Sequence, residues 1–316
     1  LLSSPVIKGE SVEFVDKSVE EVYKKVIQRL ENVLSLYEMN KKSVVVNYSI
    51  GENVLDRWIL SRIHELVKDA TIGYDTYMLD EATRGVDQFV DDLSVWYIRR
   101  TRGALKGDSG EDVQKSTYGV LRYVLETFAK VVAPVMPFVA ERIYTTIGGE
   151  KESVHLESWP TGGVIESEVI AEMKKTRELV SLGLMKRTAL KLNVKQPLLS
   201  VTFKESLTKD YLPLVEDELN VKEVKHDAGQ VEDVTLDTTI TEELQKEGDL
   251  RKLMRAIQDA RKEAGLVPSD DIVLIVSKEL DLGDLSQLHS VCKVKEIKVD
   301  TSLSAQSLEI SSGSLD

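Results

Sequence analysis

The sequence predicts an α+β protein of several domains, in which a mainly α-helical bundle is followed by smaller mixed α/β modules. Apolar residues recur at helical spacing through most of residues 18–147, whereas after residue 198 short apolar runs alternate with helical stretches. The 316 residues are enough for two or three domains. We divide the chain into a linker at 1–17, the bundle at 18–160, a basic helix with an α/β module at 161–230, and a C-terminal α/β module with a Ser-rich tail at 231–316.

Composition and charge exclude several classes of protein. Hydrophobic residues make up 42% of the chain, but no apolar run approaches the roughly 20 residues that span a bilayer. Cys292 is the single cysteine, so an internal disulfide and a zinc site built from cysteines are both excluded. The net charge of −13 argues against nonspecific DNA binding, although a local basic track on an acidic body still docks a polyanion. With no signal peptide at its start, we expect a cytoplasmic protein with no membrane or DNA partner.

Helical periodicity and end signals predict the helices of the bundle. A stripe of apolar residues runs through Ser18–Tyr37, Asn53 caps the following helix, and Pro134 separates the last two. His64 has no other His or Cys near it in the sequence, so we interpret it as a solvated helix residue and expect no metal site. The expected helices cover 18–37, 54–67, 74–102, 112–132 and 138–147.

The segment at 86–102, VDQFVDDLSVWYIRRTR, changes character within one turn. Its apolar face gives way to Arg99, Arg100 and Arg102 just before Gly103, which we read as the helix stop. Cations in a last turn complement the helix dipole, which is the structural interpretation. Guanidinium groups beside Trp96 also suit an RNA-binding surface, where aromatic rings stack on bases and the paired N–H donors of arginine bind phosphates. Arg100 falls on the side of Trp96 and needs a carboxylate such as Asp92, or a ligand, so the pattern leaves both interpretations open.

A second basic region lies between residues 171 and 204, where eight Lys or Arg residues face two acids. A solvated helix face explains part of it, including Lys186 and Arg187. Lys191, Lys195 and Gln196 fall instead in a Pro-terminated loop before a strand, which favours phosphate contact.

Short strands and helices alternate in the rest of the chain. Strands are expected at 198–203, 221–225, 231–236, 271–276 and 295–299, with helices at 209–219 and 284–291. Thr239 and Glu242 form a capping box for a helix that ends before Gly265. Arg251, Arg255 and Arg261 on this helix either contact RNA or pair with nearby carboxylates, and the sequence leaves these equal.

Three segments together indicate a family. They are WYIRRTR (96–102), VLDRWILSRIHELV (54–67) and VLRYVLETFAKVVAPVMPFVAERIY (120–144). In this order they resemble the anticodon-binding helical domain of class I aminoacyl-tRNA synthetases, specifically the isoleucyl-tRNA synthetase family. KQPL at 195–198 is similar to a Lys/Arg-Gln-Pro-Leu motif of that family, and residues 247–261 are similar to a motif of its C-terminal module.

The resemblance implies which side chains contact tRNA. Arg57 and Arg62 belong either to this footprint or to surface ion pairs. Asn32 matches a family Asn that faces the anticodon loop, although Glu31 stands where the family commonly has Trp. The implied contacts are Asn32, Arg57, Arg62, Trp96, Arg99, Arg100, Arg102, Lys186, Arg187, Lys191, Lys195, Gln196, Arg251, Arg255 and Arg261.

We do not expect this chain to catalyse a reaction by itself. The two activation signatures of class I synthetases, His-Ile-Gly-His and Lys-Met-Ser-Lys-Ser, do not occur, and no P-loop or Rossmann glycine pattern is present. We expect a C-terminal part of the ligase that neither activates isoleucine nor edits. No cofactor is expected in it, and the family implies ATP and Mg in the absent catalytic core.

The implied partners are isoleucine tRNA and the catalytic and editing domains of the same ligase. Two alternatives remain, namely the equivalent region of a valyl-tRNA synthetase, and a helical protein-interaction module without RNA binding.

Overall fold

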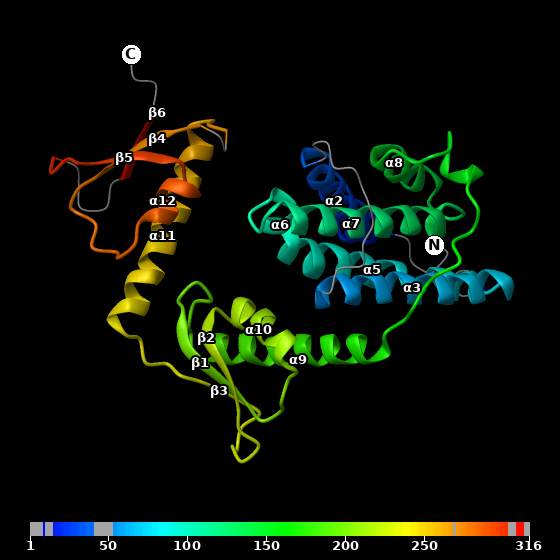
Figure 1. The fold of residues 1–316 in the computed structure, drawn as a ribbon, viewed down its shortest axis with the longest axis horizontal. Coiled ribbons are helices and arrows are strands. Elements are labelled where there is room, and N and C mark those ends of the chain that lie inside the picture. Colours follow the sequence, from blue (N-terminus) through cyan, green and yellow to red (C-terminus); the bar gives the residue numbers. More distant parts are fainter. Residues whose placement is uncertain (1–8, 10–14, 41–52, 268–269, 303–307, 313–316) are drawn as a thin grey trace. The chain divides into compact units, whose positions relative to one another are not determined.

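The computed structural model describes residue 9 and residues 15–40, 53–267, 270–302 and 308–312. The chain divides into two compact units, Leu1–Met173 and Lys174–Asp316, and each is described by itself (Figure 1). Within the described ranges, no helix combines the length and apolar character needed to cross a bilayer. Most of the expected linker, residues 41–52 between the first two expected helices, and part of the Ser-rich tail fall outside the described residues. The predicted fold class is confirmed.

Helices form the described part of unit 1, and most of them carry the predicted apolar stripe toward a common core. Two short π-helical segments, η2 and η3, continue α1 and α5. The elements are α1 (Asp16–Val22), η2 (Tyr23–Ile27), α2 (Gln28–Met39), α3 (Val54–Asp75), α4 (Leu79–Arg84), α5 (Val86–Asp91), η3 (Asp92–Ile98), α6 (Arg99–Lys106), α7 (Glu111–Val132), α8 (Pro137–Ile147) and a 3-10 turn, η4 (Val154–Leu156). Helix α9 (Ser167–Ala189) runs from the end of unit 1 into unit 2.

Aromatic side chains fill the core of the bundle. Phe89 of α5 stacks on Phe128 of α7 with ring centroids 5.5 Å apart, and Tyr37 stacks on Tyr118 at 4.5 Å. The hydroxyl of Tyr97 donates to a carboxylate oxygen of the buried Asp56 at 2.7 Å. These contacts join α2, α3, α5, η3 and α7, and they fix the helices that carry the predicted RNA-contacting residues.

The helix predicted at 74–102 is wrong as a single element. Helix α3 continues to Asp75, and the chain then turns through Tyr77, whose φ of 59° lies in the left-handed region. Gly103 does not stop a helix, because its backbone stays helical within α6. Gly107, at φ 93°, is the residue that ends α6. A glycine therefore marks the end of the helix, but four residues later than predicted.

Unit 2 contains two three-stranded sheets. In the first, β1 (Leu198–Phe203) lies between β2 (Val221–His226), which is parallel to it, and β3 (Val234–Leu236), which is antiparallel. In the second, β4 (Ile272–Val276) lies between the parallel β5 (Val294–Val299) and the antiparallel β6 (Leu308–Ser312). The helices are the 3-10 turn η5 (Lys209–Tyr211), α10 (Leu212–Leu219), α11 (Glu242–Glu263) and α12 (Ser286–Ser290).

Two details of unit 2 differ from the sequence expectation. Strand β3, which we placed with the C-terminal module, pairs with β1 and therefore completes the first sheet. Helix α11 is capped by Thr241, whose hydroxyl oxygen accepts from the backbone N of Leu244 at 3.3 Å. The expected capping box from Thr239 is wrong, because the helix begins two residues later than that motif requires.

A close approach of two helices gives a test of the bundle. An added Cβ at Gly73 on α3 would lie 2.4 Å from the backbone N of Ala82 on α4. We expect Gly73→Ala to lower the free energy of unfolding by about 1–3 kcal/mol, because neither backbone can move without disturbing its helix. Urea unfolding followed by tryptophan fluorescence measures this change.

The matched control is Gly103→Ala, since Gly103 is also helical but the nearest atom to its added Cβ would be a side-chain oxygen of Asp108, at 3.3 Å. This change is expected to be neutral or to stabilise by roughly 0.5 kcal/mol through helix propensity. Equal destabilisation by both substitutions would contradict the packing argument.

Candidate nucleic-acid interface

One pocket of unit 1 collects three of the residues that the sequence analysis singled out. Asn32 comes from α2, whereas Arg99 and Arg102 come from the first turns of α6, and all three line the pocket. Their side chains are exposed. The remaining lining residues are Val33, Leu36, Ser94 and Ile98. The pocket therefore combines an amide and two guanidinium groups with an apolar floor.

The π-helical segment η3 determines which way the arginines face. A π turn holds one residue more per hydrogen-bonded ring than an α turn, so it rotates everything that follows it. Arg100, which is half-buried, places its guanidinium 5.8 Å from the ring centroid of Trp96. The predicted proximity of these two residues is confirmed. Ser94 and Ile98 were missed as lining residues, because no sequence signal shows where a π turn shifts the helix phase.

Carboxylates on α5 and η3 are held by arginines of other helices. Asp92 is buried, and it accepts from Nε of Arg62 at 2.8 Å and from the amide of Gln88 at 3.1 Å. Asp91 accepts from Nη1 of Arg29 at 2.7 Å. These ion pairs fix the two carboxylates on the helix that leads to Arg99, Arg100 and Arg102, which we call the arginine cluster.

Arg57 and Arg62 have the ion-pair role that the sequence left open. Nε of Arg57 lies 3.1 Å from both carboxylate oxygens of Glu166, and Nη2 bonds to the same group. This hydrogen bonding lowers the pKa of Glu166 below its ordinary value. Arg62 also bonds Glu65, in addition to Asp92. Both guanidinium groups stabilise the bundle through carboxylates within unit 1.

The basic loop of unit 2 lies between α9 and β1. Lys191 is exposed with φ 56°, and Lys195 is half-buried. Lys186, at the end of α9, forms an ion pair with Glu232. The two loop lysines therefore remain the strongest phosphate-binding candidates of this unit.

Gln196 has a packing role. Its amide donates to the backbone oxygen of Leu244 at 3.0 Å and to that of Pro197 at 3.3 Å. A Cβ at Gly248 would lie 2.7 Å from its side-chain oxygen. Gln196 thus joins the basic loop to the start of α11, and Gly248, which has no side chain, makes room for it.

The prediction that Arg187 and Arg261 contact tRNA at the surface must be corrected, because both side chains are buried. Arg187 is completely inaccessible, and burial lowers its pKa to about 10. Its guanidinium donates to the backbone oxygens of Asn193, Gln196 and Asn220 at 3.0–3.1 Å. Arg261 likewise donates to backbone oxygens of its own module. Neither side chain presents a face to RNA.

The other two arginines of α11 are exposed but have neighbours. Arg251 bonds the side chain of Asn220 and, at 2.8 Å, the carboxylate of Glu247. Nε of Arg255 lies 3.6 Å from Asp259, one turn further along the helix. Pairs of this kind at the surface contribute little to stability. Their accessibility keeps both residues as candidates.

His64 is buried, and the expectation of a solvated residue is wrong. Its Nδ1 lies 2.9 Å from the backbone oxygen of Val164, and its Nε2 lies 3.0 Å from the hydroxyl of Tyr123. The acceptor at Val164 is a hundred residues away in sequence, so periodicity alone could not reveal it.

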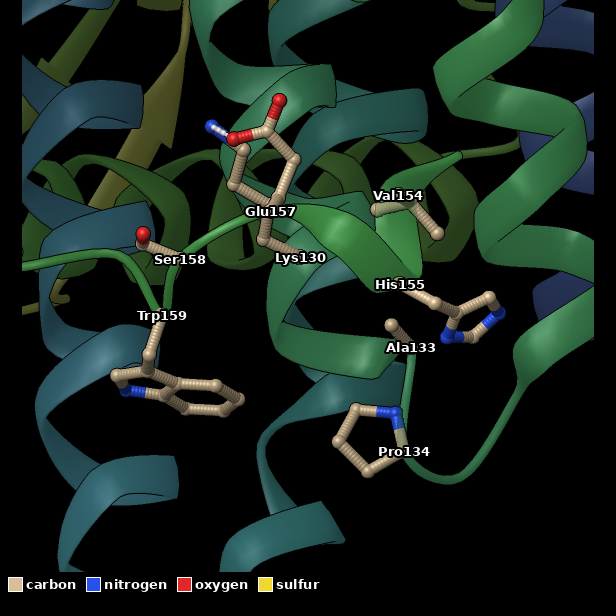
Figure 2. Close-up of a pocket in the computed structure, with 8 residues that line it drawn as sticks. All are labelled: Lys130, Ala133, Pro134, Val154, His155, Glu157, Ser158 and Trp159. Atoms are coloured by element: carbon tan, nitrogen blue, oxygen red, sulfur yellow. Dashed lines mark ion pairs between the residues drawn. The ribbon is translucent and has the colours of Figure 1, made fainter. Parts of the chain in front are cut away.

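A second pocket of unit 1 was not found from the sequence. Figure 2 shows Lys130 and Glu157 pointing toward one another beside Trp159, with the ammonium 3.4 Å from the carboxylate. Lys130 also bonds Glu126 at 2.7 Å. Because this cation already faces two carboxylates, the pocket is a poor phosphate site.

Comparison with known proteins agrees with this geometry. Residues 56–203 match the family of the anticodon-binding domain of tRNA ligase, and this range contains the arginine cluster. The chain is 28% identical over 357 aligned positions to isoleucine–tRNA ligase of Clostridium tetani, covering 84% of this chain and 34% of that protein. It is 37% identical over 242 positions to the enzyme of Chlamydia pneumoniae, covering 71% of this chain and 23% of that protein.

The helical bundle and the matched range define a tRNA ligase chain with an anticodon-binding domain. Within that class the chain belongs to the isoleucine–tRNA ligase family. It spans about a third or less of the length of the curated relatives that it matches.

The role of Arg62 can be tested through the stability of the bundle. We expect Arg62→Met to lower the free energy of unfolding by about 3 kcal/mol, because it removes a cation from the buried carboxylate of Asp92. Arg142→Met is the control, since Arg142 and its partner Glu31 are both accessible to solvent, and its loss is expected to cost less than about 0.5 kcal/mol. Urea unfolding compares the two. Unchanged stability in Arg62→Met would refute the structural role.

Proposed function

We propose that this chain is the tRNA-binding portion of an isoleucine–tRNA ligase and that unit 1 binds the anticodon stem-loop of isoleucine tRNA. The observation that carries the proposal is the convergence of Asn32, Arg99 and Arg102 on one pocket of the bundle. Two of these residues lie within the range matched by the anticodon-binding family. Side chains from two distant parts of the sequence, α2 and α6, supply the donors that RNA requires.

The pocket suits a single-stranded loop with splayed bases. The amide of Asn32 carries both a donor and an acceptor, so it can read a base edge. The guanidinium groups of Arg99 and Arg102 bind phosphates through paired donors. Trp96 is half-buried and its ring faces the guanidinium group of Arg100, and we assign it the role of an aromatic plane for base stacking.

Within the whole ligase, this chain supplies binding energy and orientation. Anchoring one end of a tRNA raises the effective concentration of its other end at a distant catalytic site. The catalytic and editing domains are the partners in this proposal, and ATP with Mg supplies the activation chemistry there. A cytoplasmic location accompanies this role.

Filter binding of isoleucine tRNA across a salt series tests the proposal. The wild-type chain is expected to bind at low salt, with an affinity that falls steeply as salt rises. The double variant Arg99→Ala, Arg102→Ala is expected to bind on the order of tenfold more weakly, with a salt slope smaller by about 1–2, because two phosphate contacts are lost.

The control removes two cations elsewhere in unit 1, by Arg84→Ala with Lys115→Ala, and is expected to keep most of the affinity. Both control residues are exposed and pair with acids of their own helices. If the wild-type chain binds no tRNA at low salt, the interaction-module alternative replaces the proposal. Preference for valine tRNA in a competition assay would favour the valyl alternative.

The chain alone is expected to be catalytically inactive. Because neither activation signature of class I synthetases occurs in it, isoleucine-dependent exchange of pyrophosphate into ATP should stay at background. A full-length isoleucine–tRNA ligase assayed in parallel is the positive control. Exchange above background that depends on isoleucine would contradict this part of the proposal.

A further inference from the structure

The chain from α9 onward contains one arrangement of elements twice. A helix of more than twenty residues is followed by a strand, a short helix, a parallel strand and an antiparallel strand. The first copy is α9, β1, α10, β2 and β3, and the second is α11, β4, α12, β5 and β6. In both sheets the first strand is central, with the second strand on one side and the third on the other.

Backbone details repeat as well. Lys191 and Gly265, 74 residues apart, both adopt positive φ just after the long helix, at 56° and 69°. One residue later, the backbone N of Leu192 donates to the oxygen of Arg187 at 2.9 Å, and that of Leu266 donates to the oxygen of Arg261 at 3.0 Å. The same motif therefore ends both helices.

The second strands begin alike. Asn220 and Lys293, at φ 50° and 55°, precede the sequences VKEVKH and VKEIKV. The oxygen of Asn220 accepts from the first residue of β1 at 3.0 Å, and that of Lys293 accepts from the first residue of β4 at 2.9 Å. The two modules share their sheet register at this point.

Each copy holds its loop with a buried arginine. Arg187 and Arg261 are 74 residues apart, and each precedes its central strand by 11 residues. Arg187 donates to the oxygen of Asn193, and Arg261 donates at 2.6 Å to that of Val267, which is the equivalent position. A planar guanidinium fork can span carbonyls that a lysine amine cannot reach together. The arginine therefore fixes the shape of the loop.

The loops differ in charge. The first loop, LKLNVKQP (190–197), carries Lys191 and Lys195. The second, AGLVPSDD (264–271), has Gly265 in place of Lys191 and ends in Asp270 and Asp271. One loop thus suits a polyanion, whereas its counterpart would repel one.

We infer that these are two copies of one module, and that only the loop of the first copy binds RNA: Arg187 is a positioning residue that presents Lys191 and Lys195 to the phosphates of the bound tRNA. The second copy keeps the arginine and the fold but lacks the cations. This inference rests on the proposed tRNA binding and extends it to a second contact region.

The test measures binding of isoleucine tRNA to the full chain across a salt series. Lys191→Gly with Lys195→Ser gives the first loop the residues of the second copy, and glycine suits the positive φ at residue 191. This variant is expected to bind on the order of tenfold more weakly with a salt slope smaller by about 1–2, and to melt as the wild type does. Unchanged affinity and slope would overturn the inference.

Arg187→Lys tests whether Arg187 positions the two loop lysines, because it keeps the charge but loses the planar guanidinium group and its several N–H donors. It is expected to weaken binding, whereas Arg261→Lys, the same change in the second copy, is expected to leave the affinity unchanged. In the Lys191→Gly, Lys195→Ser background, Arg187→Lys should cause no further loss of affinity, since it acts only through the lysines. A further loss there, or equal losses from Arg187→Lys and Arg261→Lys, would overturn the positioning role.

The outcomes separate this inference from the proposed function. If Arg99→Ala with Arg102→Ala weakens binding while the lysine variant does not, the proposed function stands and this inference fails. If the wild-type chain binds no tRNA at low salt, both fail. Should Arg187→Lys not fold, the lysine variant alone still decides whether the first loop contacts RNA.

Discussion

An arginine cannot give up its charge at physiological pH, so each one must find acceptors inside the protein or stay at the surface. This constraint sorts the arginines of the chain into distinct roles. Arg62 and Arg57 bond carboxylates of the bundle. Arg187 donates to three backbone carbonyl oxygens, and its complete burial lowers its pKa. Arg99 and Arg102 remain exposed on a pocket. The binding surface that we propose is built on these two exposed arginines.

The same constraint explains how a chain with a net charge of −13 can bind a polyanion. Long-range repulsion from acidic residues is screened within about 8–10 Å in physiological salt, whereas cations in direct contact with a phosphate are not. Carboxylates close to the arginine cluster, such as Asp91 and Asp92, are compensated by arginines from other helices. Local pairing therefore matters more than the overall charge.

Part of this structure could be predicted from the sequence, and the division has physical reasons. Proline and glycine mark helix ends through their own backbone preferences, so the bounds of α8 were predictable from Pro137 and Gly148. The side on which Arg100 lies was predictable from the position of Trp96. The burial of Arg187 was not, because its acceptors are backbone carbonyls, which every residue has and no residue pattern reveals. The antiparallel pairing of β3 with β1 was missed because a three-residue strand carries little periodicity.

Gly248 connects the two α/β modules and restricts which substitutions each of them can accept. It lies inside a long helix, where glycine weakens the helix, yet an added Cβ there would lie 2.7 Å from the side-chain oxygen of Gln196, which would have to shift. Although each module has its own sheet, a residue 52 positions away therefore limits what the second module can accept. A substitution that moves Gln196 in the first loop therefore changes which residue fits at position 248 of α11. The sequences of the two modules are expected to change together at these positions.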